Sequence, residues 1–333
     1  MMATEEKTIR TTYSQEWHEY NQAQTNEKAR FLELLYQLCK GIEEPIQTFG
    51  RPRLPYAEMV FAVCFKTYST VSSRRFISDL NDAKNKGFIS KVPHFNSISN
   101  YLELENLTPL LKELIVASTL PLKFVESNFA VDSSGFSTGR TQRWVDAKWG
   151  NARAQYGGKG IDRRDWLKLH IMCGCKTNIV TSVEVTHAHA GDSPQFAPLV
   201  EQTSENFTMN TVCADKAYSS NKNLKLVLVK GAQPYIAFRS NSTDGPQQSD
   251  MWRRLYRFYQ YHQDQFMLHY HKRSNVETTF SMIKAKFGER LRSKTVVAQT
   301  NEVLCKVLCH NICCLIQSIY ELGVEPNFWA DSY

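Results

Sequence analysis

The stretch "HYHKRSNVETTFSMIKAKF" (residues 269–287) carries four different polar groups at steps of three, four and seven residues. These groups are Tyr270, Arg273, Glu277 and Lys284. On a helix with about 100° per residue they fall within about 60° of one another. The adjacent arc carries the apolar residues Val276, Phe280, Ile283 and Phe287. The pattern predicts a helix with one buried stripe and, beside it, a stripe of one acid, two bases and a phenol.

The charges on this predicted helix are not scattered as on an ordinary solvated face, where acids and bases form pairs four residues apart. The lone carboxylate, Glu277, has Arg273 one turn before it and Lys284 two turns after it. This order suits an anionic substrate that crosses the helix with a metal ion at its centre. A surface helix with charges placed by chance is the alternative, and the rest of the chain must decide between them.

The composition is that of an ordinary globular protein with a modest positive charge. The 333 residues are 42% hydrophobic and 22% charged, with a formal net charge of +7. This length allows two domains, and the charge is compatible with nucleic acid without being evidence for it. We expect a cytoplasmic protein, because the sequence contains no run of about 18 apolar residues and no apolar core of a signal peptide.

The nine cysteines do not indicate a disulfide framework, because their number is odd and no secretion signal is present. Cys305, Cys309 and Cys313 share one face of a predicted helix among leucine, valine and isoleucine. Structural zinc sites usually take their ligands from paired short loops. We therefore interpret these three thiols as core packing.

Residues 1–125 are predicted to be mostly helical. Two short helices, within 72–87 and 95–103, are joined by a turn that contains proline. They could form a helix-turn-helix-like unit that binds DNA ends, with Arg74 and Arg75 contacting phosphates. A plain helical bundle that covers the second domain is the alternative.

Residues 126–333 change in character and alternate strands with helices. Strands are expected within 127–138, in a hairpin over 166–192, and within 209–220 and 233–238. Long helices then run from about residue 250 to the end. This order predicts an α/β fold, a mixed sheet flanked by helices on both faces.

Two of the predicted strands end on an aspartate, Asp132 in "FAVDSS" and Asp215 in "TVCADKAY". Active groups of an open α/β sheet collect where the chain leaves the strands. Glu277, on a helix across the sheet, could complete a set of three acids. Three such acids repel one another unless cations neutralise them, and carboxylates suit Mg²⁺ or Mn²⁺. Two ions about 3.5–4 Å apart would support phosphodiester chemistry.

With these residues in place, the sequence resembles the DDE transposases of prokaryotic insertion sequences, in the branch with a Tyr-x2-Arg-x3-Glu-x6-Lys signature. The signature positions are filled without a gap by Tyr270, Arg273, Glu277 and Lys284. Asp132 matches the first acid of the family and Asp215 the second. The resemblance covers about 126–320. It implies a ribonuclease H-like catalytic domain over 126–333, preceded by the helical domain over 1–125.

The resemblance also implies a function: the protein would cut double-stranded DNA at element ends and join it to target DNA, as a homodimer associated with the nucleoid. Asp132 would bridge two metal ions, while Asp215 would hold one of them and Glu277 the other. Water would attack the phosphodiester first, and the freed 3′-OH would then attack target DNA. A metal-dependent nuclease on the same scaffold, and a DNA-binding regulator with a relic catalytic domain, are the alternatives.

Several basic residues are expected to contact the DNA. Arg273 and Lys284 would grip phosphates near the scissile bond, and Tyr270 would bind a phosphate or orient Arg273. A Gly-rich loop after Asp132 would follow the DNA backbone, unless it is simply solvated. Its basic residues include Arg140, Arg143, Arg163 and Arg164.

Two further residues have open roles. Asp192 is interpreted as a helix N-cap, with support of a metal ligand as the alternative. Only 62 positions separate Asp215 from Glu277, which predicts no β-rich domain inserted between them. Trp252 is the only tryptophan in that interval, and we expect it to pack in a core or an interface rather than to flip a base.

Overall fold

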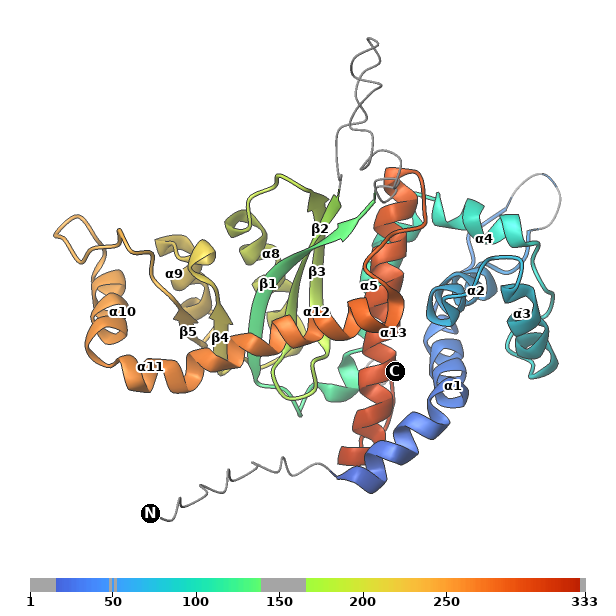
Figure 1. The fold of residues 1–333 in the computed structure, drawn as a ribbon, viewed down its shortest axis with the longest axis horizontal. Coiled ribbons are helices and arrows are strands. Elements are labelled where there is room, and N and C mark those ends of the chain that lie inside the picture. Colours follow the sequence, from blue (N-terminus) through green and yellow to red (C-terminus); the bar gives the residue numbers. More distant parts are fainter. Residues whose placement is uncertain (1–15, 48–49, 51–52, 139–165, 330–333) are drawn as a thin grey trace, which may run out of the picture.

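The computed structural model describes residues 16–47, 50, 53–138 and 166–329. Within these residues five strands form one sheet with helices on both faces, and a set of helices precedes it (Figure 1). The strands are β1 (Asn128–Ser137), β2 (Trp166–Gly174), β3 (Val180–His187), β4 (Thr211–Ala214) and β5 (Gln233–Ile236). Their order is β3-β2-β1-β4-β5, with β1 antiparallel to β2 and parallel to β4. The mixed sheet is the one that the sequence predicts, and it is ribonuclease H-like, as the family resemblance implies.

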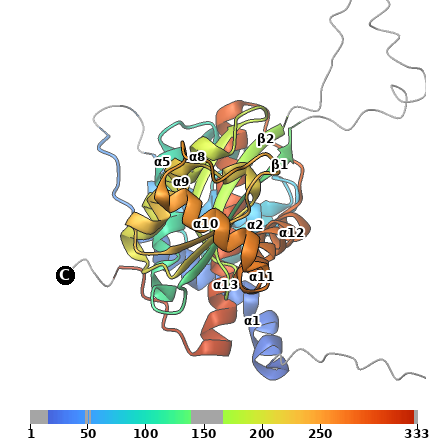
Figure 2. The same ribbon diagram turned by 90° about the vertical axis from the view of Figure 1, so that its left-hand side faces the viewer.

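The two faces of the sheet belong to different hydrophobic clusters, because side chains alternate along each strand. The helices that cover the sheet include α8 (Ser193–Asn206), α9 (Asn221–Val229), α12 (Ser274–Phe287) and α13 (Val296–Leu322). In β1, Phe129 and Val131 pack in the cluster of α8 and α9. Ala130, between them, packs in the cluster of α12 and α13. Figure 2 shows α8 and α9 on one side of the sheet and α12 on the other.

The buried stripe of α12 is the one that the sequence predicts. Val276 and Ile283 are fully buried, and Phe280 and Phe287 are 6% and 7% exposed. The helix ends at Gly288, whose φ of 80° lies in the left-handed region that glycine adopts without strain. The stripe therefore fixes which side of α12 faces the sheet.

The helix predicted over 269–287 is interrupted at its first turn. It consists of α11 (Gln263–Tyr270), the 3-10 turn η3 (His271–Arg273) and α12. Near the interruption, the carbonyl of His269 accepts a hydrogen bond from the Cys213 thiol at 3.3 Å. The carbonyl of Lys272 accepts one from the Cys175 thiol at 3.8 Å. Backbone carbonyls of α11 and η3 thus face thiols of the sheet region, which a wheel of one straight helix does not capture.

The N-terminal helices are α1 (Trp17–Cys39), α2 (Tyr56–Ser69), α3 (Phe76–Asn85), α4 (Phe95–Leu102) and α5 (Leu107–Ala117). Of these, α1, α2, α4 and α5 pack against α13. By length and composition α13 could cross a membrane, but 78% of its most apolar window is buried inside the protein, as in a core helix. Cys305 and Cys309 on α13 are fully buried, which confirms core packing for these two thiols. Cys313 is half-buried.

The hydrophobic core is continuous across the predicted boundary at residue 125. One cluster contains Phe31 of α1, Phe61 of α2, Ala130 of β1 and Ile283 of α12. Helices α3 and α4 form where the sequence predicts them and both pack against α2. Nine residues, 86–94, connect them. A DNA-binding role for this pair remains a prediction.

Candidate active site

The positions of Asp132 and Asp215 follow from the register of β1 and β4. The parallel pairing of these strands ends at Val131 and Ala214, so the two aspartates are the next residues along neighbouring strands. Paired strands lie about 4.8 Å apart, which makes the aspartates neighbours. The sequence suggested that Asp132 ends its strand, and this was wrong, because β1 continues to Ser137 in its pairing with β2. The two aspartates therefore lie next to each other where β4 ends, at a point in the middle of β1.

Both aspartates project on the face of the sheet that α12 covers. Asp132 follows Ala130 by two residues and Asp215 follows Cys213 by two, and these two apolar residues belong to the cluster of α12. Glu277 lies in the first turn of the same helix and is exposed. The fold therefore brings an acid from β1, an acid from the end of β4 and an acid from α12 to one side of the sheet.

The pKa of Asp132 is affected by the charges of the other two acids. Burial raises the pKa of Asp132, and the negative charges of Asp215 and Glu277 raise it further. The Ser133 amide, which donates to Oδ1 at 2.8 Å, and the Arg273 guanidinium act in the opposite direction. Asp132 thus lies in a partly buried, acidic environment in which a positive charge is favourable.

Arg273 connects two of the three acids. Its Nη1 lies 3.3 Å from Oδ2 of Asp132, and its Nη2 lies 2.6 Å from Oε1 of Glu277. The ring of Tyr270 lies beside the guanidinium, with its centroid 6.0 Å from Cζ, a distance at which a cation and a ring attract. Burial raises the pKa of this phenol. Arg273 therefore offsets part of the repulsion among the acids, and Tyr270 helps to orient it.

The donor set fits divalent metal chemistry, although its arrangement is not that of a formed metal site. Among the residues that the structure describes, no group of three or more histidine, cysteine or acidic side chains is arranged to hold a metal ion. Arg273 pairs with both Asp132 and Glu277 at this position. Carboxylate oxygens are nevertheless the ligands that Mg²⁺ and Mn²⁺ prefer. Burial and the two neighbouring acids raise the pKa of Asp132, so a positive charge placed beside it would favour its ionised form.

Asp192 does not act as the helix cap that the sequence suggests. It occupies the N-cap position of α8, but its side chain makes no capping hydrogen bond. Its Oδ1 instead accepts a hydrogen bond from the Ser133 hydroxyl at 2.7 Å and pairs with the Lys168 ammonium at 2.6 Å. Nδ1 of the buried His170 lies 3.5 Å from the same oxygen. Burial opposes its charge, but these polar partners outweigh that effect and lower the pKa of Asp192.

This polar group lies behind Asp132 on the opposite face of β1. Ser133 pairs with His170 in the β1–β2 register, and Lys168 is two residues before His170 on the same face of β2. Asp192 thereby ties the backbone next to Asp132 to the start of α8. The sequence contained a signal for it, because lysine and histidine at alternate positions interrupt the apolar strand "WLKLHIMCG".

The remaining predicted DNA contacts are partly described. Lys284 pairs with Glu289 at 3.2 Å, and its ammonium lies over the ring of Phe136 at 5.4 Å from the centroid. Arg74 and Arg75 are exposed just before α3. The other four predicted contacts lie outside the described residues: Arg140, Arg143, Arg163 and Arg164.

The interval between Asp215 and Glu277 is fully described and contains helices and one short strand rather than a β-rich domain. Within it, α10 (Asp250–Tyr261) is amphipathic. Trp252 is 7% exposed, packs edge-on against Phe238 and donates from Nε1 to the carbonyl of Thr243 at 2.9 Å. This confirms the expectation of a core tryptophan.

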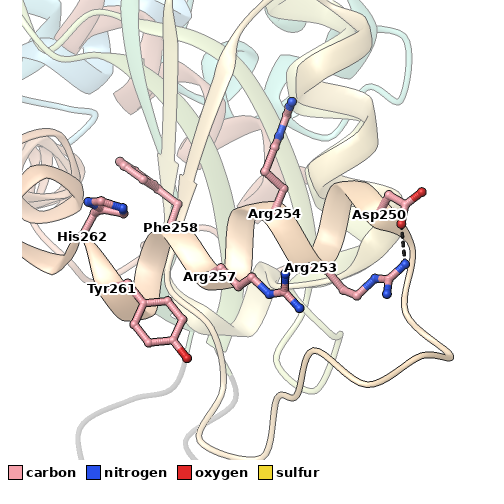
Figure 3. A pocket seen from close by; sticks show the side chains of 7 residues that line it. All are labelled: Asp250, Arg253, Arg254, Arg257, Phe258, Tyr261 and His262. Atoms are coloured by element: carbon pink, nitrogen blue, oxygen red, sulfur yellow. Dashed lines mark hydrogen bonds and ion pairs between the residues drawn. The ribbon is translucent and has the colours of Figure 1, made fainter.

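The outer side of α10 is basic and borders a hollow of about 550 Å³ (Figure 3). Its arginines are Arg253, Arg254 and Arg257. Arg253 pairs with Asp250, and Arg257 pairs with Asp244 at 3.0 Å. Figure 1 places α10 at the end of the molecule beyond β5, away from α12. The hollow is therefore separate from the acids on the α12 face.

A family model described as "Transposase DDE domain" matches residues 123–312, more than half of the chain. The chain belongs to this family. The matched region runs from just before β1 into α13 and contains Asp132, Asp215 and Glu277. The resemblance to DDE transposases of insertion sequences is confirmed by this match, and with it a general role in DNA transposition and recombination. Searches of curated proteins and of solved structures found no significant match.

Proposed function

We propose that this DDE transposase cleaves phosphodiester bonds at the ends of a mobile element and joins the freed 3′-OH to target DNA. The observation that carries the proposal is the convergence of three acids on the α12 face, where Asp132 neighbours Asp215 and is linked to Glu277 through Arg273. The substrate would be double-stranded DNA. A homodimer would act on it, because joining two element ends requires two active sites, and it would work in the cytoplasm at the nucleoid.

In this proposal Asp132, Asp215 and Glu277 hold two Mg²⁺ or Mn²⁺ ions. When bound, such ions activate the attacking oxygen and stabilise the leaving one. The protein supplies the carboxylates in their ionised form, since only ionised acids bind a cation well.

The chain's own residues would also position the DNA. A guanidinium has five N–H donors, and the two ion pairs of Arg273 use two of them. The side chain could therefore contact a phosphate while it stays beside the acids. Lys284, two turns along α12, would contact the next part of the backbone, and Tyr270 would keep Arg273 in place.

The test is a cleavage and joining assay on DNA that borders the gene of this protein, with a labelled 3′-OH end and Mg²⁺. We expect the wild-type protein to cleave and join. Replacement of Asp132, Asp215 or Glu277 by alanine should abolish both reactions. Asp250→Ala is the matched control, because Asp250 is an exposed acid on α10 whose side chain is 95% accessible.

The outcomes separate the alternatives. Cleavage without joining would indicate a metal-dependent nuclease. DNA binding without cleavage would indicate a regulator with a relic catalytic domain. If Glu277→Ala retained full joining activity, the assignment of the three acids would be wrong.

A further inference from the structure

The α12–α13 loop, residues 288–295, follows the helix that carries Glu277 and is held by a buried acid of α13. Glu302 is 7% exposed. Its carboxylate accepts hydrogen bonds from the backbone amides of Arg292 at 3.0 Å and Ser293 at 2.8 Å. Hydrogen bonds to an ionised acceptor are about twice as strong as neutral ones. The acid thus fixes the centre of an otherwise irregular loop.

A buried base of α13 fixes the start of the same loop. Lys306 is 2% exposed, and its ammonium donates to the carbonyls of Gly288 at 2.7 Å and Arg290 at 3.1 Å. The amide of Leu291 donates to the carbonyl of Ser137, at the end of β1, at 2.9 Å. Burying charged groups is costly unless they are fully bonded. The carboxylate of Glu302 and the ammonium of Lys306 together hold the backbone of the α12–α13 loop in one conformation.

This conformation places Arg292 against the N-terminal helices. Its Nη1 donates to the carbonyl of Val71 at 3.2 Å, in the turn that follows α2. The Arg292 charge acts on Lys66 of α2, which is half-buried. Burial, and to a smaller extent the charge of Arg292, lower the pKa of Lys66 to about 8, while the charge of Glu302 acts in the opposite direction.

The positive charge of Lys66 is only partly offset by its surroundings. Among the described residues its ammonium makes neither a hydrogen bond nor an ion pair, and its one close ring contact is Phe76, 5.9 Å from the centroid. Arg74 and Arg75 continue the turn from Val71 and are exposed. Lys66 and Arg292 therefore lie close enough to repel each other, and an anion beside them would relieve this repulsion.

We propose that Lys66 and Arg292 form a binding site for backbone phosphates of duplex DNA, outside the catalytic centre; this rests on the proposed function. Gly288, at the end of α12, lies eleven positions after Glu277, which corresponds to about 16 Å along the helix. At about 3.4 Å per base pair, a duplex along α12 would meet this site roughly five base pairs from the scissile bond.

The experiment measures binding of a fluorescein-labelled duplex of mixed sequence over a range of salt concentrations, in EDTA so that cleavage cannot occur. The variant is Lys66→Met combined with Arg292→Gln. The matched control is Lys222→Gln combined with Lys225→Gln, which removes the same charge from exposed positions on α9. The logarithm of the binding constant falls linearly with the logarithm of the salt concentration. The slope of this line becomes steeper by about one for each phosphate contact.

We expect the slope of the Lys66/Arg292 variant to be smaller than that of the wild type by about two, and the slope of the control to stay unchanged. Lys66→Arg with Arg292→Lys should restore the slope, which separates lost charge from lost fold. Equal slopes for wild type and variant, or equal changes in variant and control, would overturn the site while leaving the proposed function intact. If the Lys66/Arg292 variant had the smaller slope but the wild-type protein showed no joining activity, the phosphate-binding site would be retained and the proposed function would be contradicted.

Discussion

Two clusters of like charge lie towards opposite ends of α12, and they differ in what offsets them. At the start of the helix, Asp132 and Glu277 share the guanidinium of Arg273. At its end, the charge of Arg292 acts on Lys66, and neither cation forms an ion pair among the described residues. The nearby carboxylate of Glu302 accepts hydrogen bonds from the loop backbone. The acid cluster contains a counter-charge that pairs with two of its members. In the cation cluster, the charge of Glu302 acts on Lys66 without forming an ion pair with it. We interpret the difference as the contrast between a site that binds cations and one that binds a polyanion.

The two clusters also arise differently. The acids occupy positions fixed by strand register and helix periodicity, so regular secondary structure brings them together. The cations are brought together by an irregular loop, which Glu302 and Lys306 hold from α13. Substitutions in the two clusters should therefore have different effects on activity, stability and DNA binding.

The largest effect is expected from removing one charge of the acid cluster. Glu277→Gln should lower joining activity on the order of a thousandfold or more, because it removes a proposed metal ligand. The same change should not lower the thermal unfolding temperature without metal, since it also removes a repelling charge next to Asp132. Joining assays and unfolding curves in EDTA measure the two effects. A large loss of stability in EDTA would mean that Glu277 has a structural role instead.

Metal binding offers a second way to sharpen the comparison. In the wild type, Mg²⁺ at about 100 times its dissociation constant should stabilise the folded state by about 2.7 kcal/mol. Asp132→Asn should remove most of this gain, whereas the Lys66/Arg292 variant should keep it. Thermal unfolding at increasing Mg²⁺ concentrations measures the difference. An identical metal response in the wild type and in Asp132→Asn would show that the ion binds elsewhere.

A smaller loss of activity is expected behind the acid cluster. Asp192→Asn keeps the shape of the side chain but weakens its contacts with Ser133 and Lys168. Supporting partners of this kind typically contribute 10–100-fold to metal affinity or activity. We expect a loss in that range, with a higher Mg²⁺ concentration needed for half-maximal joining. Asp250→Asn is the control, and a loss that no Mg²⁺ concentration restores would argue for misfolding instead.

Features that depend on regular secondary structure could be predicted from the sequence, and features that depend on contacts between distant parts of the chain could not. The strands, the mixed sheet, the stripe of α12 and the face shared by Asp132 and Asp215 all depend on local periodicity and on strand ends, which a sequence displays. The break before Ser274 does not show in the helical periodicity, and the thiols of Cys175 and Cys213 that contact carbonyls near it lie far away in the chain.

Long-range packing explains the other differences. Asp192 has the residue type and position of a cap, but the partners that draw its side chain away come from β1 and β2. The meeting of Lys66 with Arg292 depends on residues of α2 and of the α12–α13 loop, more than 200 positions apart. No motif joins them, so only the folded chain reveals the cluster.

The smallest effect is expected in the cation cluster without DNA. The pKa of Lys66 is lowered to about 8 from an ordinary value of 10.5. The unfolded chain therefore binds this proton more tightly, and the penalty for folding with a charged Lys66 is full below about pH 8 and disappears as the pH rises to about 10.5. Lys66→Met should stabilise the protein at pH 7 by about 1 kcal/mol after allowance for solvent screening.

This gain should shrink as the pH is raised from 8 to 10, because the wild-type lysine then loses its proton and with it the cost of a buried charge and the repulsion from Arg292. Chemical unfolding of the wild type and of Lys66→Met at pH 7 and pH 10 measures it, with Lys222→Met as the exposed control. A destabilised variant at pH 7 would mean that Lys66 is a favourable structural charge. The cluster would then need no anion, and the contrast with the acid cluster would disappear.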